Sequence, residues 1–288
     1  MNMINAIVGA KGDMAKNLLV RLLSQLGEVV LADRDSSIEE RKKVWESDVI
    51  WLSIPRDKIK EAIEGVHLRP DQLIIDICSI KRRVSEQIKA TGAAHLSLHP
   101  LHGPNVLWNR QRWVVINAKA TECNENAQKI IQFLRGRGIS FIQCETEDQH
   151  DFMMGIVLSM PEMMTVAMDC LISLYAEKCG REKPGINEMM AWATPIFDLL
   201  FSAYLRGVTS SAPWLRKDLL LGAFGNLVGV SKETFEKMSK LTVPDLEELL
   251  SRQGNLIKEI SPETMSNLNK RINEWYATST LDAFHPPT

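Results

Sequence analysis

Two short segments of the sequence carry side chains that can accept or hold a proton. They are Asp76–Lys81 and His99–Asn105. A histidine titrates near neutral pH, so His99 is suited to take a hydroxyl proton while hydride leaves the same carbon atom. Ser79 can orient or relay that proton. A histidine before proline is as often structural as catalytic, so both interpretations of His99 are open on these residues alone.

A candidate nucleotide site lies near the start of the chain. A short β-branched run ends at Gly9, and a helix is predicted to open at Asp13 and Met14. Glycine at positions 9 and 12 allows a tight turn and the close approach of a pyrophosphate to backbone amides. The N-terminus of the following helix adds partial positive charge. We therefore predict that Gly9, Gly12, Asp13 and Met14 bind a dinucleotide.

The type of dinucleotide depends on the residues that end the next strands. Asp33 lies at the end of the second predicted strand, where a carboxylate can accept from both ribose hydroxyls and repel a 2′-phosphate. This favours NAD, while the adjacent Arg34 keeps NADP open. The plain alternative is a solvated acid after an ordinary strand. Ser53 and Pro55 end a later strand and are expected to line the nicotinamide ribose.

Seven short apolar runs alternate with helical stretches up to about residue 145, a pattern typical of buried parallel strands in βαβ units. The candidate strands are Met3–Val8, Val29–Ala32, Val49–Ile54, Leu73–Ile77, His95–Leu98, Trp113–Ile116 and Ser140–Ile142. The helix Asp13–Leu26 separates the first two. Residues 1–145 are therefore predicted to form an α/β Rossmann-type dinucleotide-binding domain with a doubly wound sheet.

The pattern after residue 145 is helical. Thr146–Gln149 is a capping-box pattern that predicts a helix start, and Pro161 predicts a kink in the helix that follows. Thr194–Pro195 indicates another start, with Gly207 as its stop. Ser261–Glu263 opens a last helix. We predict that residues 146–288 form an all-helical domain for substrate binding and dimerisation.

Composition narrows the partners. The 288 residues suffice for two domains, and 34 basic against 36 acidic residues give a charge of −2, which argues against nucleic-acid binding and for a small-molecule partner. Five cysteines without a C-x-x-C pair indicate a reducing cytoplasm. We see no leader and no apolar run of about 18 residues, so we expect a soluble protein without a membrane span.

The helical half is rich in apolar residues, which predicts a homodimer through it. They include Phe197, Phe201, Tyr204, Trp214 and Trp275.

Four motifs, in order, make the chain from Ile7 to about Ala277 resemble the prephenate dehydrogenase family. The family's D-x-x-S-[VI]-K segment is matched by Asp76–Lys81, its H-P-[ML]-x-G-P segment by His99–Pro104, its E-[KH]-H-D helix start loosely by Glu147–Asp151, and its S-P-I-Y helix with a later arginine by Thr194–Phe197 and Arg206. The resemblance implies a dinucleotide-binding domain joined to a helical dimerisation domain. It also implies oxidation of a cyclohexadienyl carboxylate that loses carbon dioxide and becomes aromatic.

The resemblance also implies roles for single residues. His99 would accept the hydroxyl proton with Ser79 hydrogen-bonded to it, and Arg206 would bind a substrate carboxylate through its planar guanidinium. Alternatively, Arg206 satisfies the last carbonyls of its helix. His150 would bind substrate or form an interdomain contact. Lys81 would steer a dianionic substrate or belong to a solvated helix start.

Three departures from the family pattern bear on the substrate. The family usually has an apolar residue where His102 stands, often an acid where Asn105 stands, and commonly a histidine where Glu162 stands. If Glu162 faces the substrate, its charge is costly there unless the substrate offers a cation. An amino group would do so, as in 4-amino-4-deoxyprephenate or arogenate. Alternatively, Glu162 faces outward or pairs with a protein cation, and the substrate is prephenate. A nucleotide-binding sensor without turnover is the second class of function.

Overall fold

The computed structural model describes residues 3–104, 106–116, 124–192 and 227–238, and scattered residues from 240 to 263. It divides the chain into two compact units, Met1–Val157 and Leu158–Thr288. Helix α7 (Glu147–Met154) packs against α4 (Arg82–Lys89) and strand β7 (Ser140–Cys144). The first unit therefore continues past residue 145, the expected end of the first domain.

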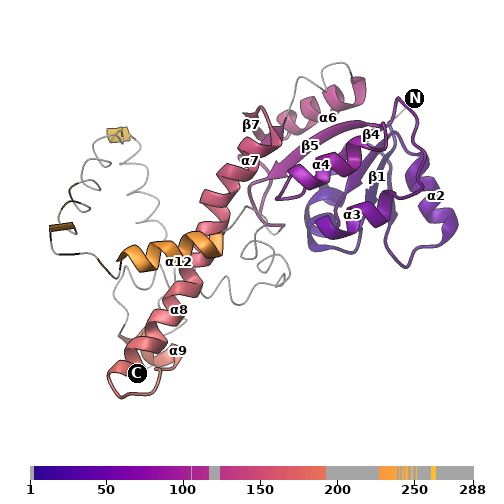
Figure 1. Ribbon diagram of the computed structural model, residues 1–288. Helices are drawn as coiled ribbons and strands as arrows, with labels where there is room; N and C mark the ends of the chain where they lie inside the picture. The colour runs from indigo at the N-terminus through magenta and orange to yellow at the C-terminus, as the bar shows by residue number, and fades with distance from the viewer. Residues whose placement is uncertain are drawn as a thin grey trace. The chain divides into compact units, whose positions relative to one another are not determined.

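A seven-stranded sheet forms the centre of the first unit (Figure 1). Its strands are β1 (Asn5–Val8), β2 (Val29–Ala32), β3 (Val49–Leu52), β4 (Leu73–Asp76), β5 (Ala94–Pro100), β6 (Arg112–Ile116) and β7. All seven predicted strands are present. Their order is β2-β1-β3-β4-β5-β6-β7, so β1 lies between the two strands that follow it in sequence. The order of the strands reverses there, and such a switch point is where open α/β sheets bind ligands.

Strand β6 differs from the expected all-parallel arrangement, because it runs antiparallel to β5. The reason is the connection from Pro100 to Arg112, in which the described residues form bends and turns rather than a helix. A parallel neighbour needs a crossover of a dozen or more residues, usually a helix. Helix α6 (Glu125–Gly136) then provides such a crossover, and β7 pairs parallel to β6.

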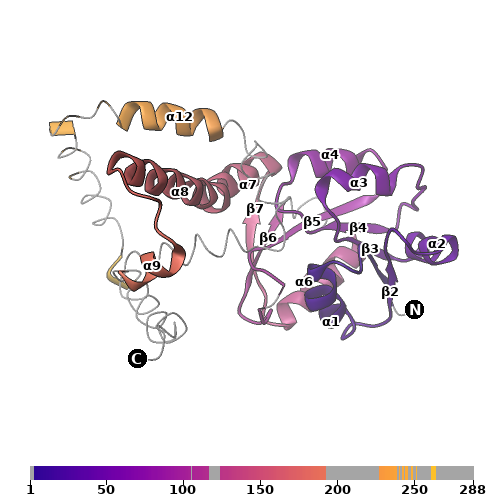
Figure 2. The same cartoon turned by 90° about the horizontal axis from the view of Figure 1, so that it is seen from below.

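Helices cover both faces of this sheet (Figure 2). The π-helical turn η1 (Ala15–Leu19), α1 (Val20–Leu23) and α6 pack on one face, while α2 (Ile38–Glu46), α3 (Arg56–Ile63) and α4 pack on the other. Neighbouring strand residues alternate between the two cores: Trp51 belongs to the first and Ile50 to the second. Because both faces are buried, the strands are continuously apolar in sequence.

The first helix after the sheet begins as predicted. Thr146 accepts a hydrogen bond from the Gln149 backbone N–H at 3.1 Å, and the Gln149 side chain accepts from the Glu145 N–H at 2.9 Å. Helix α7 continues through the π-helical turn η2 (Gly155–Ser159) into α8 (Met160–Lys178). Pro161, the predicted kink, follows this turn directly.

The described residues of the second unit form helices, as expected. Besides α8 they include α9 (Ile186–Ala191) and α12 (Leu227–Met238). Several predictions lie outside the described residues. They concern Asn105, Thr194, Pro195, Phe197, Phe201, Tyr204, Arg206, Gly207, Trp214 and Trp275.

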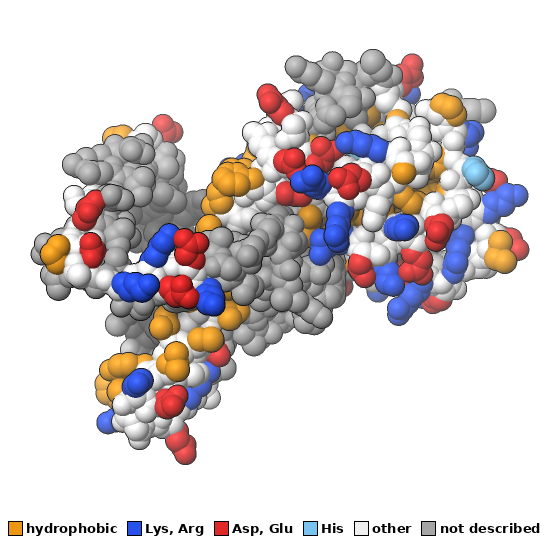
Figure 3. Space-filling model, in the orientation of Figure 1, with side chains coloured by type: hydrophobic (Ala, Val, Ile, Leu, Met, Phe, Trp, Pro, Cys, Tyr) orange, Lys and Arg blue, Asp and Glu red, His pale blue; other side chains and the backbone are white. Residues whose placement is uncertain are grey.

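Among the described residues, the helix Glu147–Lys178 is long and apolar enough to cross a membrane, with a mean hydropathy of 1.5. No uninterrupted apolar run of about 18 residues was expected from the sequence, whereas this helix qualifies by its mean hydropathy, with polar residues among the apolar ones. A single such helix is a weak indication, since core helices of soluble proteins pass the same test. Figure 3 shows hydrophobic side chains over α8 and α9, and interspersed acidic and basic side chains on α12 and on the first unit.

Candidate active site

The turn after β1 brings backbone against backbone at the switch point of the sheet. Gly9 has a φ of +87°, and a Cβ atom there would lie 2.4 Å from the carbonyl oxygen of Ser53. Only glycine fits this position without a shift of the main chain. Gly12 donates its N–H to the Gly9 carbonyl at 3.1 Å and closes the turn. The predicted cofactor residues Gly9, Gly12 and Ser53 therefore lie together, and Pro55 forms the N-cap of α3 beside them.

Asp33 joins the end of β2 to the same turn. Its Oδ2 accepts from the Lys11 backbone N–H at 2.9 Å, and its Oδ1 accepts from the Arg34 N–H at 2.8 Å. Nearby, Lys11 forms an exposed ion pair with Asp35. Each oxygen of the Asp33 carboxylate keeps lone-pair capacity for a ribose hydroxyl. The glycine turn and this carboxylate fit a dinucleotide, and the helix opened by Asp13 and Met14 is placed to face its phosphates.

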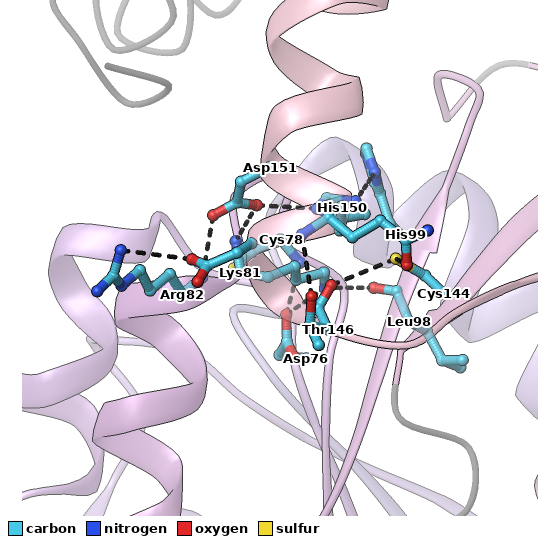
Figure 4. Close-up of polar contacts among 12 residues, drawn as sticks. Asp76, Cys78, Lys81, Arg82, Leu98, His99, Cys144, Thr146, His150 and Asp151 are labelled. Atoms are coloured by element: carbon cyan, nitrogen blue, oxygen red, sulfur yellow. Dashed lines mark hydrogen bonds and ion pairs between the residues drawn. The ribbon is translucent and has the colours of Figure 1, made fainter.

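His99 lies near the carboxyl end of β5, the strand beside β4. It is only 6% exposed. Its Nδ1 lies 3.0 Å from Nε2 of His150 in the first unit (Figure 4). Burial, followed by the positive charge of Lys81, lowers the pKa of His99 well below its usual value. The imidazole is therefore neutral at pH 7, which is the form that can accept a proton.

His150 is held in turn by the residue that follows it. Its Nδ1 lies 2.8 Å from Oδ1 of Asp151. The Asp151 carboxylate accepts backbone N–H groups from Lys81 at 2.9 Å and from Arg82 at 3.1 Å. These amides belong to the start of α4, where a carboxylate satisfies free N–H groups and complements the helix dipole. Asp151 thus joins α7 to α4. No role of its own was predicted for this residue from the sequence, although it is the last residue of the matched E-[KH]-H-D motif.

Lys81 is fully buried, which neither a substrate-steering cation nor a solvated helix start would be. Its ammonium group donates to Asp76 Oδ1 at 2.5 Å and to the Leu98 carbonyl at 2.6 Å. His95 contacts the other carboxylate oxygen of Asp76 at 2.8 Å. Burial acts to raise the pKa of Asp76, but Lys81 and His95 outweigh it and hold that pKa well below its usual range. Lys81 thereby ties the buried Asp76 to the main chain of Leu98, the residue before His99.

Two further predicted residues have different partners from those expected. Within the described part of the chain no hydrogen bond joins Ser79 to His99, because Nδ1 of His99 faces His150 instead. Ser79 is half-buried in the loop before α4. His102 accepts from Trp113 Nε1 at 2.9 Å, so its Nδ1 donates to the Gly103 carbonyl at 2.9 Å. Both ring nitrogens of His102 are used to hold its own loop.

The remaining predicted substrate residues belong to other parts of the chain. Glu162 lies half-buried in the first turn of α8, in the second unit. Asn105 and Arg206 are outside the described residues. No group of three or more acidic, histidine or cysteine side chains that could hold a metal ion occurs among the described residues.

Comparisons with known proteins agree with this fold. Residues 27–143 match the family model described as "Prephenate dehydrogenase, nucleotide-binding domain". No curated protein matches the chain. Prephenate dehydrogenase from Aquifex aeolicus, solved with hydroxyphenyl propionate and NAD+, superposes with a TM-score of 0.57 at 18% identity and covers 96% of this chain and 98% of its own. Synechocystis arogenate dehydrogenase gives 0.56 at 17% identity, with 90% and 100% covered.

The fold and the site define a Rossmann-like nucleotide-binding domain, with a glycine turn at the sheet's switch point and a neutral histidine at the same edge. These structural neighbours, below 25% identity, establish the fold alone. The family match covers strands β2 to β6, nearly all of β7 and both motif segments around His99, but neither β1 nor the glycine turn. Residues 27–143 are therefore similar to the nucleotide-binding domain of prephenate dehydrogenases.

Proposed function

We propose that this protein catalyses the NAD-dependent oxidative decarboxylation of prephenate or a close analogue, giving a 4-substituted phenylpyruvate. The observation that carries the proposal is the neutral His99, buried at the carboxyl end of β5 and bonded through Nδ1 alone among the described residues. A neutral imidazole with a free nitrogen is a proton acceptor. The family match and the neighbour solved with NAD+ support NAD as the cofactor.

In the proposed reaction the chain orients the substrate and accepts one proton. When NAD is bound at the glycine turn, its nicotinamide supplies the acceptor for hydride from ring C4. His99 takes the proton from the C4 hydroxyl as the hydride leaves. The resulting dienone is a vinylogous β-keto acid, so the ring carboxylate departs as carbon dioxide and the ring becomes aromatic. Arg206 is the proposed ligand of a substrate carboxylate, and Asp33 of the ribose.

The substituent at ring C4 is the finer question. Prephenate, with a hydroxyl group, is our first choice because it is the default substrate of the family. An amino substrate, either 4-amino-4-deoxyprephenate or arogenate, is the alternative if Glu162 faces the substrate, because a carboxylate beside a dianion is costly without a cation. Glu162→Gln distinguishes them. If the amine contacts Glu162, this variant raises KM for the amino substrate alone, whereas an unchanged preference contradicts the amino hypothesis.

The proposal is tested by absorbance at the reduced-nicotinamide band with NAD and each of the three substrates. We expect turnover with at least one, and His99→Asn should lower kcat by about 100-fold to 10,000-fold, the usual contribution of a positioned base. His67→Asn, at an exposed position of the same unit, is the matched control. Absence of turnover with all three substrates, with NAD still bound, would favour a nucleotide-binding sensor.

The same proposal includes a soluble homodimer in the cytoplasm, assembled through the helical second unit. It is supported by the apolar side chains that α8 exposes in the single chain, such as Met164 and Leu174. Sedimentation of the full-length protein tests it. A monomer at micromolar concentration, or partition into membranes, would contradict this part of the proposal without affecting the chemistry.

A further inference from the structure

Three side chains of the first unit form a continuous line of hydrogen bonds. It runs from His99 Nδ1 to His150 Nε2 at 3.0 Å and from His150 Nδ1 to Asp151 Oδ1 at 2.8 Å (Figure 4). A carboxylate has acceptors but no donor, so the proton between His150 and Asp151 is on His150 Nδ1. The direction of the second bond in the line is therefore fixed by Asp151.

That direction decides which nitrogen of His99 carries a proton. A neutral His150 protonated on Nδ1 has a lone pair on Nε2, so it accepts from His99. His99 must then hold its own proton on Nδ1. Its Nε2, which makes no hydrogen bond within the described residues, is left with the lone pair.

The His150 side chain is enclosed within the first unit. The side chain is buried, with the whole residue 2% exposed, and it lies in the first turn of α7, where the helix carries partial positive charge. The Asp151 carboxylate is also shared, because it already accepts two backbone N–H groups from the start of α4.

We propose that His150 and Asp151 are positioning residues that select the proton-accepting tautomer of His99, with the proton fixed on Nδ1 and the lone pair on Nε2. In the reaction of the proposed function, the substrate O–H bond breaks and an N–H bond forms on Nε2, while the hydride and its electron pair pass to oxidised NAD. The imidazolium keeps its Nδ1–H bond to His150. The proton leaves to water after the product departs.

Asparagine at position 151 would disturb this selection. The amide offers one acceptor oxygen and one donor group in place of two acceptors. With the oxygen toward His150, the amide NH2 meets the N–H of Arg82; with the amide reversed, the NH2 meets His150 Nδ1 and the N–H of Lys81. In the reversed position His150 must carry its proton on Nε2, so His99 becomes the acceptor and loses the lone pair on its own Nε2.

The kinetic test compares Asp151→Asn with Asp148→Asn. Asp148 lies in the same helical turn but is exposed, and it pairs only with Arg82 among the described side chains. We expect Asp151→Asn to lower kcat by at least about 100-fold with KM changed by less than about threefold, because the interaction acts on the transition state. Asp148→Asn should stay within about twofold of the parent protein. Equal kcat values for the two variants would overturn the proposal.

A second measurement reads the tautomer directly and needs no substrate. In protein labelled with 15N-histidine, nitrogen NMR near pH 7 distinguishes protonated from unprotonated ring nitrogens, and His99→Asn assigns the signals among the six histidines. We expect His99 to be protonated on Nδ1 in the parent protein and on Nε2 in Asp151→Asn. A parent His99 protonated on Nε2 overturns the inference even if the enzyme is active. Conversely, an inactive enzyme with the expected tautomer contradicts only the proposed function.

Discussion

The nucleotide turn and the histidine site lie at the same edge of one sheet but hold their charges differently. At the turn, Lys11 and Asp35 form an ion pair with each other, and their side chains are 62% and 61% exposed. At the histidine site, Lys81 and Asp76 pair with no exposure at all. The turn owes its shape to backbone, since Gly9 lacks the Cβ that would strike Ser53. The histidine site owes its shape to side chains.

This difference predicts which changes each region tolerates. An exposed ion pair contributes little to stability, because water screens both partners before and after the change. A buried charge that loses its partner has no such compensation. The histidine site should therefore be sensitive to removal of one charge, and the nucleotide turn to addition of one carbon atom.

The largest effect is expected for Lys81→Met. The substitution keeps the side-chain length but leaves the Asp76 carboxylate buried without its cation. Breaking a buried ion pair from one side typically costs about 3–5 kcal/mol. Urea unfolding of the variant should show a loss in that range, together with a loss of activity because Lys81 also binds the carbonyl of Leu98, the residue before His99.

The matched control is Lys58→Met, which breaks the exposed pair between Lys58 and Glu61. We expect it to change the urea midpoint far less than Lys81→Met does. The double variant Lys81→Met with Asp76→Asn should recover part of the lost stability, because the unpaired charge is gone. Equal midpoints for Lys81→Met and Lys58→Met would contradict the comparison.

A smaller effect is expected for Gly9→Ala. The alanine would have to adopt a φ of +87°, and its Cβ would lie 2.4 Å from the Ser53 carbonyl oxygen. Gly92→Ala isolates the backbone cost, because Gly92 has a φ of +76° and nothing lies within 4 Å of its Cβ position. A left-handed alanine costs about 1 kcal/mol, so Gly9→Ala should lose more than that and bind NAD more weakly. Calorimetric titration with NAD and thermal unfolding check both; equal losses would sink the close-approach argument.

Much of the fold could be predicted from the sequence, because its signals are local. The seven strands are continuous apolar runs, and the alternation of Ile50 and Trp51 between two cores explains why no polar residue interrupts them. The helix cap at Thr146 likewise depends on only four consecutive residues, so it could be predicted from them. The antiparallel β6 was missed because the length and nature of its connection, rather than its own residues, decide its direction.

The histidine site was only partly predictable, because its contacts join distant parts of the chain. His99 and His150 are 51 residues apart, and nothing around either residue indicates the other. Lys81 opens a basic run typical of a solvated helix start. Its burial follows from its hydrogen bonds to Leu98 and Asp76, which the sequence does not indicate. His102 was expected to face substrate, but Trp113 from the antiparallel strand takes one of its nitrogens.

The smallest effect is a dependence of stability on pH that belongs to the buried site. The pKa of His99 is lower in the folded protein than in the unfolded chain, where a histidine titrates near about 6.5. Between these two values the unfolded chain binds more protons, so the free energy of unfolding falls as the pH falls. One such group gives a slope of up to about 1.4 kcal/mol per pH unit.

Urea unfolding between pH 7 and pH 5 isolates this group, because the lowered carboxyl pKa values of Asp76 and Glu147 act only below about pH 4.5. His99→Gln should flatten the slope, since glutamine binds no proton in either state. The control is His67→Gln, which removes an exposed imidazole from the same unit. If the two variants change the slope equally, the dependence belongs to histidines in general, and the contrast between the buried site and the exposed surface fails for this group.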